Sequence, residues 1–265
     1  SIGFGTSAGG LTSLAVGSST STVGAQSVAM GINTTTAGEF SLAMGSSSST
    51  TSNGAGSVAM GAFATSNAAQ AFSLGFSTTS NGAQSLALGS QTTTVGDQSV
   101  ALGSQTTTDG DFSFAMGSSS STTSTGVGAV AMGDTAVANG AQSFSLGANT
   151  NSNGAQSFAM GSSTTAGGDQ SFALGSSTTA LGQASLAFGT GSNTTAGATN
   201  AVAMGLNAEA DGPQSFSLGT GTLSSGTSSF ALGDSTVAGA DTSFALGSGT
   251  TTLGQSSLAF GTGSN

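Results

Sequence analysis

The stretch Ser27-Val28-Ala29-Met30-Gly31 decides the fold, because its pattern of small, large apolar, small, large apolar and Gly recurs 19 times along the chain. Most of the closing glycines follow one another at a fixed 14-residue interval, as at Gly75, Gly89 and Gly103. A unit this short cannot bury a core of its own, so it must be covered by stacking on its neighbours. The sequence therefore predicts a solenoid in which each 14-residue repeat is one coil.

A longer period is superimposed on the first. The step lengthens by two at Gly45 to Gly61, Gly117 to Gly133 and Gly189 to Gly205, and these long steps recur at a constant spacing. Each 72-residue super-repeat therefore contains one long coil and four regular ones. Two extra residues inside a strand would turn all later side chains to the wrong face. We therefore expect them to bulge at a corner, near Ser49 to Asn53, Ser121 to Thr125 and Asn193 to Gly197.

The chain shows one continuous architecture. Its last residues, Gly261 to Asn265, repeat Gly189 to Asn193, and no atypical capping repeat is visible. We expect residues 1–265 to form a single continuous β-roll that is a fragment of a longer repetitive protein.

Each coil has the pattern of two short strands. In Ser27 to Gly31 the side chains alternate across a strand, so Val28 and Met30 share one face, and Ser27 and Ala29 share the other. The second half of the coil, such as Thr34-Thr35-Thr36, has small residues on both flanks of a variable one. Glycines at the corners supply the backbone angles that other residues resist. The prediction is all-β, without helical periodicity.

Two assignments of the interior are open. Stacked sheets usually lie ~10 Å apart, a space that calls for large residues opposite the small ones of the second strand. On this volume argument we expect motif positions two and four to point inward, for example Phe72, Leu74, Phe158, Met160, Phe230 and Leu232. The reverse assignment places the small residues inside and the large ones against another chain.

The composition excludes several classes of function. The chain has no Lys, Arg, His, Cys, Trp or Tyr, and its ten acidic residues give a net charge of −10. Without cations it cannot bind nucleic-acid phosphates or an anionic membrane by charge. No apolar run approaches the ~18 residues of a membrane span. Most nucleophile–base pairs cannot be assembled, so we expect no enzyme and no cofactor.

Three carboxylates form the one candidate metal site. Asp97 and Asp111 are one coil apart at the same corner, so they should stack ~5 Å from each other, with Asp109 nearby. Carboxylate oxygens are the ligands that calcium prefers. The alternative is that these are solvated corner carboxylates.

Two polar columns complete the pattern. Gln side chains recur at one corner, which predicts a ladder of stacked amides, at Gln26, Gln70, Gln84, Gln98, Gln142, Gln156, Gln170 and Gln214. In the second strand of each coil, the variable residue between the two small ones is often Thr, and these residues should form a column. They are Thr35, Thr65, Thr79, Thr93, Thr107, Thr165, Thr179 and Thr251. Such a column is similar to the surface of ice-binding solenoids, although Val137, Asn151 and Glu209 interrupt it.

The repeats resemble the head repeat of trimeric autotransporter adhesins, the YadA-like head. The resemblance rests on segments such as Ala129-Val130-Ala131-Met132-Gly133-Asp134-Thr135-Ala136-Val137-Ala138-Asn139-Gly140, and again on residues 201–212. It implies a left-handed parallel β-roll that forms trimers on a bacterial surface or on a related phage fibre.

The resulting hypothesis is a structural cell-surface fibre or adhesin segment that mediates attachment or assembly outside the cell. Its partners would be copies of itself, in a trimer or filament, and an unidentified receptor. The alternatives are a phage tail-fibre shaft and an ice-binding β-solenoid.

Overall fold

The computed structural model describes residues 1–51, 53–123 and 125–264. Within these residues there is no helix. The chain is a parallel β-solenoid of about 18 coils with about 14 residues in each turn, as its repeats predict. From residue 14 onward each coil contributes a long strand, which begins at motif position two, and a two-residue strand, whereas in the first strand Ile2 pairs with Val16 at position four and Gly3 pairs with Gly17. Two compact units are described below, Ser1–Thr135 and Ala136–Asn265.

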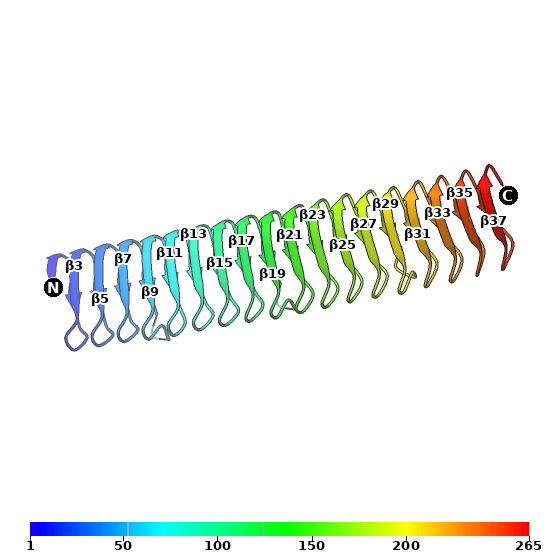
Figure 1. The fold of residues 1–265 in the computed structure, drawn as a ribbon. Coiled ribbons are helices and arrows are strands. Elements are labelled where there is room, and N and C mark those ends of the chain that lie inside the picture. The colour runs from blue at the N-terminus through cyan, green and yellow to red at the C-terminus, as the bar shows by residue number, and fades with distance from the viewer. Residues whose placement is uncertain (52, 124, 265) are drawn as a thin grey trace. The chain divides into compact units, whose positions relative to one another are not determined.

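The first unit contains two sets of parallel strands (Figure 1). The long strands are β1 (Ile2–Phe4), β3 (Leu14–Ser18), β5 (Val28–Ile32), β7 (Leu42–Ser46), β9 (Val58–Ala62), β11 (Phe72–Phe76), β13 (Leu86–Ser90), β15 (Val100–Ser104), β17 (Phe114–Ser118) and β19 (Val130–Asp134). The short strands are β2 (Ser7–Ala8), β4 (Ser21–Thr22), β6 (Thr35–Thr36), β8 (Ser49–Thr50), β10 (Thr65–Ser66), β12 (Thr79–Ser80), β14 (Thr93–Thr94), β16 (Thr107–Thr108) and β18 (Ser121–Thr122).

The second unit repeats this arrangement. Its long strands are β21 (Phe144–Ala148), β23 (Phe158–Ser162), β25 (Phe172–Ser176), β27 (Leu186–Thr190), β29 (Val202–Leu206), β31 (Phe216–Thr220), β33 (Phe230–Asp234), β35 (Phe244–Ser248) and β37 (Leu258–Thr262). Its short strands are β20 (Val137–Ala138), β22 (Asn151–Ser152), β24 (Thr165–Ala166), β26 (Thr179–Ala180), β28 (Asn193–Thr194), β30 (Glu209–Ala210), β32 (Leu223–Ser224), β34 (Val237–Ala238) and β36 (Thr251–Thr252).

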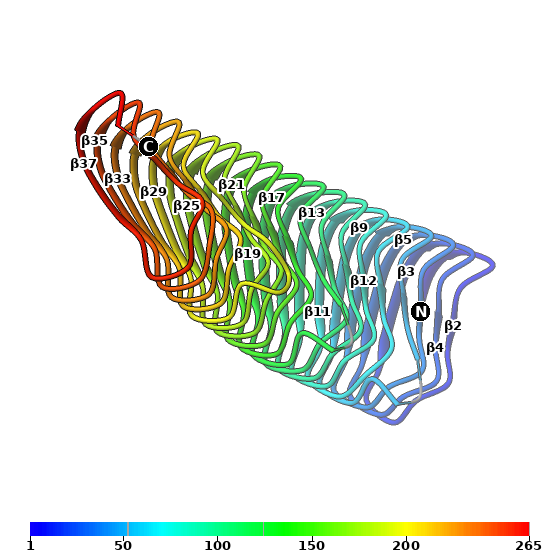
Figure 2. The ribbon, with the colours of Figure 1, turned by 90° about the vertical axis from the view of Figure 1, so that its right-hand side faces the viewer.

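Equivalent residues of successive coils stack on one another. In β23 and β25, Phe158 pairs with Phe172, Ala159 with Ala173 and Gly161 with Gly175. Figure 2 shows the coils of each unit following one another with closely similar outlines. Because the pairing is in register, every motif position becomes a column of like side chains. The chemistry of each face can therefore be understood one column at a time.

The expected interior was wrong, because the small residues of the motif lie inside and the large ones lie outside. Ala159 is completely buried, whereas its neighbours Phe158 and Met160 are only half-buried and point away from the interior. The same correction applies to the other residues expected inside, Phe72, Leu74, Phe230 and Leu232, of which Phe72 is 41% exposed. The core consists of Ala, Ser and Thr from motif positions one and three and from the short strands.

The narrow gap between the two sets of strands explains the correction. The Ser66 hydroxyl on β10 donates a hydrogen bond to the backbone carbonyl of Val58 on β9, at 2.6 Å. A single serine side chain therefore bridges the interior. This gap is far smaller than the ~10 Å between ordinary stacked sheets on which the volume argument relied. A Phe or Met side chain does not fit in it.

Hydroxyl groups of the interior pair with one another in a recurring chain. The Thr36 hydroxyl donates to the Ser27 hydroxyl at 3.0 Å, and Ser27 donates to the carbonyl of Gly24 at 2.6 Å. The same chain recurs one super-repeat later, from Thr108 through Ser99 to Gly96. These bonds satisfy the hydroxyl groups that take part in them, which would otherwise be costly to bury. Other buried hydroxyls of the interior, such as those of Thr34, Thr92 and Thr164, have no hydrogen-bond partner among the described residues.

The motif glycines are required by contact between coils. Gly161 has a φ of +131°, which side chains rarely adopt, and a Cβ placed on it would overlap the carbonyl oxygen of Gly175. The backbones of successive coils approach at this column so closely that only a hydrogen atom fits between them.

The extra residues of the long coils bulge at the corner after the short strand, as expected. The bulges are closed by backbone hydrogen bonds from Gly54 to Thr51 at 3.0 Å, from Gly126 to Thr123 at 2.8 Å and from Ala198 to Thr195 at 3.0 Å. Two residues of the expected segments, Ser52 and Ser124, lie outside the described residues. The third bulge is visible in yellow in Figure 1. Pairing of the long strands is undisturbed, since Met44 still pairs with Met60 in register.

Candidate functional site

The outer surface of the long strands carries the large apolar side chains, and we call it the apolar face. It consists of motif positions two and four. In the first unit these are Ile2, Leu14, Val16, Val28, Met30, Leu42, Met44, Val58, Met60, Phe72, Leu74, Leu86, Leu88, Val100, Leu102, Phe114, Met116, Val130 and Met132. In the second unit they are Phe144, Leu146, Phe158, Met160, Phe172, Leu174, Leu186, Phe188, Val202, Met204, Phe216, Leu218, Phe230, Leu232, Phe244, Leu246, Leu258 and Phe260.

Phenylalanine rings form regular ladders on the apolar face of the second unit. The centroids of Phe144 and Phe158 are 5.1 Å apart, and those of Phe158 and Phe172 are 4.7 Å apart, with the rings nearly parallel. A second ladder joins Phe216, Phe230 and Phe244. The in-register coils impose this face-to-face stacking. The ladders keep the face smooth and fix the positions of its largest side chains.

The apolar face is incompletely covered by the chain itself. Met30 is 36% exposed, Leu88 44% and Phe188 43%. Soluble monomers rarely expose large contiguous apolar patches, and such patches mark interaction sites. Because every coil of both units adds two large apolar residues to the face, the exposure is systematic.

No charge lies on the apolar face. The ten acidic residues are at corners, in the short strand β30 or at the ends of β19 and β33, as follows: Glu39, Asp97, Asp109, Asp111, Asp134, Asp169, Glu209, Asp211, Asp234 and Asp241. Motif positions two and four therefore bring no like charges to a second copy, although Asp134 and Asp234 border the face at the ends of β19 and β33 and each copy carries a net charge of −10.

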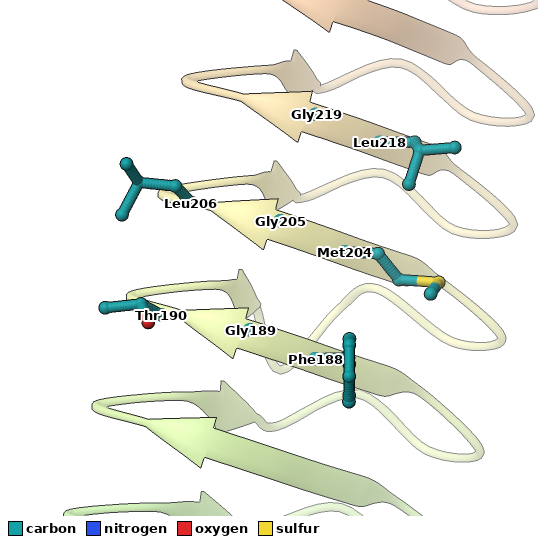
Figure 3. Close-up of a pocket in the computed structure, with 8 residues that line it drawn as sticks. All are labelled: Phe188, Gly189, Thr190, Met204, Gly205, Leu206, Leu218 and Gly219. Atoms are coloured by element: carbon teal, nitrogen blue, oxygen red, sulfur yellow. The ribbon is translucent and has the colours of Figure 1, made fainter.

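A hollow interrupts the apolar face in the second unit, and we call it the glycine groove. Its volume is about 390 Å³, and its lining residues are Phe188, Gly189, Thr190, Met204, Gly205, Leu206, Leu218 and Gly219. Figure 3 shows Phe188, Met204 and Leu218 along one side, Thr190 and Leu206 along the other, and the glycines between them. The groove exists because the three glycines have no side chain to fill the space.

The structure places two of the predicted calcium ligands against the backbone. The Asp97 carboxylate accepts a hydrogen bond from the N–H of Ala83 at 2.7 Å, and Asp111 accepts one from the N–H of Asp97 at 2.8 Å. Asp109 directly follows β16. Among the described residues, no group of three or more His, Cys, Asp or Glu side chains is placed to hold a metal ion. The calcium site stays a prediction, while the backbone contacts give Asp97 and Asp111 a role in joining coils.

The predicted amide ladder is present in part at the corner before motif position one, over Gln70 and Gln84 and over Gln142, Gln156 and Gln170. Gln84 donates to Gln70 at 3.2 Å, and Gln170 donates to Gln156 at 3.3 Å. These residues have positive φ values, such as 58° at Gln84. The ladder therefore joins coils at a strained corner. Gln70 and Gln84 also border a hollow of about 530 Å³ with Phe72 and Leu86.

A second amide ladder was not predicted. It lies at the opposite corner, where Gln105 donates to Gln91 at 3.3 Å and Ser119 donates to Gln105 at 3.2 Å. Both glutamines occupy the second place after a motif glycine in successive coils, so the repeat alignment contains the signal. In both ladders the glutamine side chains form hydrogen bonds with side chains of neighbouring coils of the same chain.

The side-chain carboxyl of Asp211 has a shifted pKa. Burial raises the pKa of this carboxyl above the ordinary value, and the nearby Thr195 hydroxyl, which donates a hydrogen bond to the backbone carbonyl of Asp211 at 3.2 Å, partly opposes the shift. Ionisation in the folded state is therefore less favourable than in the unfolded chain. Stability is gained as the pH falls through the folded-state pKa and is lost as the pH rises.

We expect Asp211→Asn to remove this dependence on pH. Asn occupies the equivalent positions in the preceding super-repeats, at Asn67 and Asn139, so the fold accepts it. At pH 7 the variant should be slightly more stable, by less than about 0.5 kcal/mol, and the difference should shrink towards about pH 4. Urea unfolding at both pH values measures it. A difference that grows on acidification would contradict the assignment.

Comparison with known protein families identifies the repeats. The family model described as YadA head domain repeat (2 copies) matches residues 23–48, 52–78, 80–106, 95–120, 124–150, 152–178, 196–222 and 224–250. These matches cover most of the chain and most of its apolar face. A search of curated proteins finds no match to the chain. The described ranges hold no helical segment with the length and apolarity of a membrane span.

Proposed function

Because the chain belongs to the YadA head family, we propose that it is a segment of an extracellular surface fibre that assembles with copies of itself through the apolar face. The assembly would display the remaining surfaces for attachment. Heads of this family are trimeric surface adhesins, which supports an assembly of three chains on a bacterial cell.

The apolar face is the single observation that carries this proposal. Its residues are large, uncharged and in register along each unit, while the interior holds only small residues. In a water-soluble chain the large apolar residues are expected inside. The large apolar residues can lie outside the coil if a second chain covers them, because burying their apolar surface then stabilises the assembly.

The surfaces that would remain free are mixed, with polar columns and, at the corners, exposed apolar side chains such as Phe40, Phe63 and Phe112. The short strands expose one residue in each coil, often Thr, and the corners carry the amide ladders and the acidic residues. These surfaces, with the bulges of the long coils, are where we expect a receptor to bind. The side-chain inventory is that of a structural segment, because it has no His, Cys or Lys. No specific observation favours a phage shaft or ice binding, and the Thr column is interrupted at Val137, Asn151 and Glu209.

We expect Phe158→Asp to abolish assembly without unfolding the coils. Phe158 is half-buried in the free chain, and an Asp in its place would put an unpaired carboxylate in the interface between chains. The parent chain of 24.6 kDa should sediment as a trimer, at three times the chain mass. The variant should sediment as a monomer with an unchanged far-UV circular dichroism spectrum.

Thr165→Asp is the matched control, because Thr165 points outward from the short strand β24 in the next half-coil. This variant should remain assembled. Equal loss of assembly in both variants, or a parent chain that is monomeric at micromolar concentration, would contradict the proposal.

A further inference from the structure

Two phenylalanine side chains form an exposed pair at the corner that follows the long strands of the first unit. Phe63 comes directly after β9, and Phe76 is the last residue of β11, so they belong to successive coils. Their ring centroids are 6.0 Å apart with the ring planes nearly perpendicular, and the side chains are 55% and 51% exposed. Phe76 borders the apolar face and Phe63 lies beyond it. The pair is therefore separate from motif positions two and four.

The backbone at Phe63 argues against a structural reason for its ring. Phe63 has a φ of 60°, in the left-handed region that bulky side chains disfavour. The equivalent place in other coils also has a positive φ, and there it holds residues that suit this conformation, such as Asn33, Asn149 and Gly221. Phenylalanine is thus an unfavourable choice where the fold accepts asparagine or glycine. Backbone strain of this kind clusters at functional sites.

The next super-repeat shows that the coil does not need the two rings. The places of Phe63 and Phe76 are taken there by Thr135 and Ala148. Thr135 has the same positive φ, 56°, and Ala148 ends β21 as Phe76 ends β11. A requirement of the coil itself would apply to each super-repeat alike. The aromatic pair is therefore a local feature whose reason lies outside the packing of the coils.

Uncharged hydrogen-bonding groups continue this corner beyond the rings. The backbone N–H of Gln91, in the next coil, donates to the carbonyl of Phe76 at 2.8 Å. The Gln105 amide donates to the Oε1 of Gln91 at 3.3 Å, and the Ser119 hydroxyl donates to Gln105 at 3.2 Å. In the part of the chain that the structure describes, no hydrogen bond uses the Nε2 of Gln91 or the hydroxyl of Ser77. Two donors beside the rings are therefore available to a ligand.

We propose that this corner binds a neutral saccharide, with a sugar ring against Phe63 and Phe76 and its hydroxyl groups on Ser77 and Gln91. The inference rests on the proposed attachment role and names the class of receptor. It does not depend on self-assembly, because no residue at motif position two or four takes part.

The chemistry of a sugar matches both parts of this corner. The faces of a pyranose ring carry weakly positive C–H groups, which the negative face of an aromatic ring attracts. The hydroxyls around its edge donate and accept hydrogen bonds, as an amide does. Aromatic side chains with a few placed polar groups are the usual composition of a small-ligand site. A purely apolar segment would leave the donors of Ser77 and Gln91 without partners.

Charge argues against other ligands. The chain has no Lys, Arg or His, so an acidic sugar or a phosphate would meet no cation. A cationic ligand would be favoured at the opposite corner, where the exposed Phe40 and Phe112 directly follow Glu39 and Asp111. Those two rings also have positive φ values, but within the described ranges neither contacts another ring. The corner of Phe63 is therefore the one that combines paired rings with uncharged donors.

The test is titration calorimetry with defined oligosaccharides. The neutral probes are cellohexaose, mannohexaose and chitohexaose, and an alginate hexamer is the acidic probe. Each variant takes a residue that this chain uses at an equivalent place, so the fold accepts it: Phe63→Asn, Phe76→Ala and Gln91→Ser. The matched control is Phe112→Ala, which removes a ring that is 61% exposed and introduces the residue of the next super-repeat, Ala184. Urea unfolding and sedimentation are measured on the same samples.

We expect the parent to bind at least one neutral probe and not the alginate hexamer. The three variants should weaken this binding by at least about tenfold, and Phe112→Ala should bind as the parent does. Phe63→Asn should also unfold at a higher urea concentration, because it relieves the strain at a positive φ. If the ring had only a structural role, this variant would unfold at a lower urea concentration instead.

Three results would overturn the saccharide proposal: a parent that binds no neutral probe, a parent that prefers the alginate hexamer, or undiminished binding in Phe63→Asn. Sedimentation tests the proposed assembly separately, since all four variants leave the large residues of the apolar face in place. A monomeric parent that binds a neutral probe would overturn the assembly and keep the saccharide site. An assembled parent that binds none would do the reverse.

Discussion

Replacing Ala159 by Asp is expected to unfold its coil and the coils on either side. Ala159 is completely buried in the narrow interior, where no cation is available to pair with a carboxylate. An uncompensated buried charge costs about 3–5 kcal/mol, and the side chain also lacks the space it needs. Because each coil of a solenoid contacts only its neighbours, the loss should begin locally. Thermal melting followed by far-UV circular dichroism, with hydrogen exchange to locate the loss, measures the effect.

The adjacent Phe158→Asp provides the sharpest control. It introduces the same charge one residue away, on the opposite face of β23. In the isolated chain it removes the stacking with Phe144 and Phe172, worth about 0.5–1.5 kcal/mol for each pair. The coil should remain folded. If the two variants unfolded equally, the interior described here would be wrong.

Replacing Gly161 by Ala is expected to be nearly as damaging, although it adds only a methyl group. The positive φ of +131° is unfavourable for any residue with a Cβ, and that Cβ would overlap the carbonyl oxygen of Gly175. Backbone strain of this kind costs about 1–3 kcal/mol, and the overlap adds to it because backbone cannot move as a side chain does. Urea unfolding should give a loss of at least about 3 kcal/mol.

Gly197→Ala is the matched control for this prediction. Gly197 lies in the third bulge, has no positive φ, and a Cβ placed there would meet no atom within 4 Å. Its substitution should leave stability unchanged or slightly raised, because Ala reduces the freedom of the unfolded chain. A loss as large as that of Gly161→Ala would show that glycine is needed for a reason other than contact between coils.

The architecture could be predicted from the sequence because the repeat restricts where strands and corners can lie and how successive coils can pair. A 14-residue interval, an alternating five-residue motif and a glycine at its end determine strands, corners and register together. The position of the bulges followed from the same argument, since Met44 and Met60 stay paired across the longer coil. The Gln70–Gln84 ladder followed from spacing alone.

The direction of the side chains could not be predicted in this way. Alternation divides a strand into two faces but does not say which one is inside, and that depends on the distance between the two layers. The Ser66 hydroxyl reaches the carbonyl of Val58 across this distance, which no sequence rule revealed. The apolar face was therefore first assigned to the interior, although the pattern of large residues was recognised.

Methionine oxidation tests the central claim most directly. All seven Met residues occupy motif position four on the apolar face. Peroxide converts exposed thioethers to sulfoxides, which mass spectrometry counts for each peptide. In the assembled parent we expect the methionines to be protected, and in the folded, monomeric Phe158→Asp variant we expect them to be oxidised rapidly without loss of β-structure. Methionines that stay protected in the folded monomer would contradict the account, because they would then lie inside the coil.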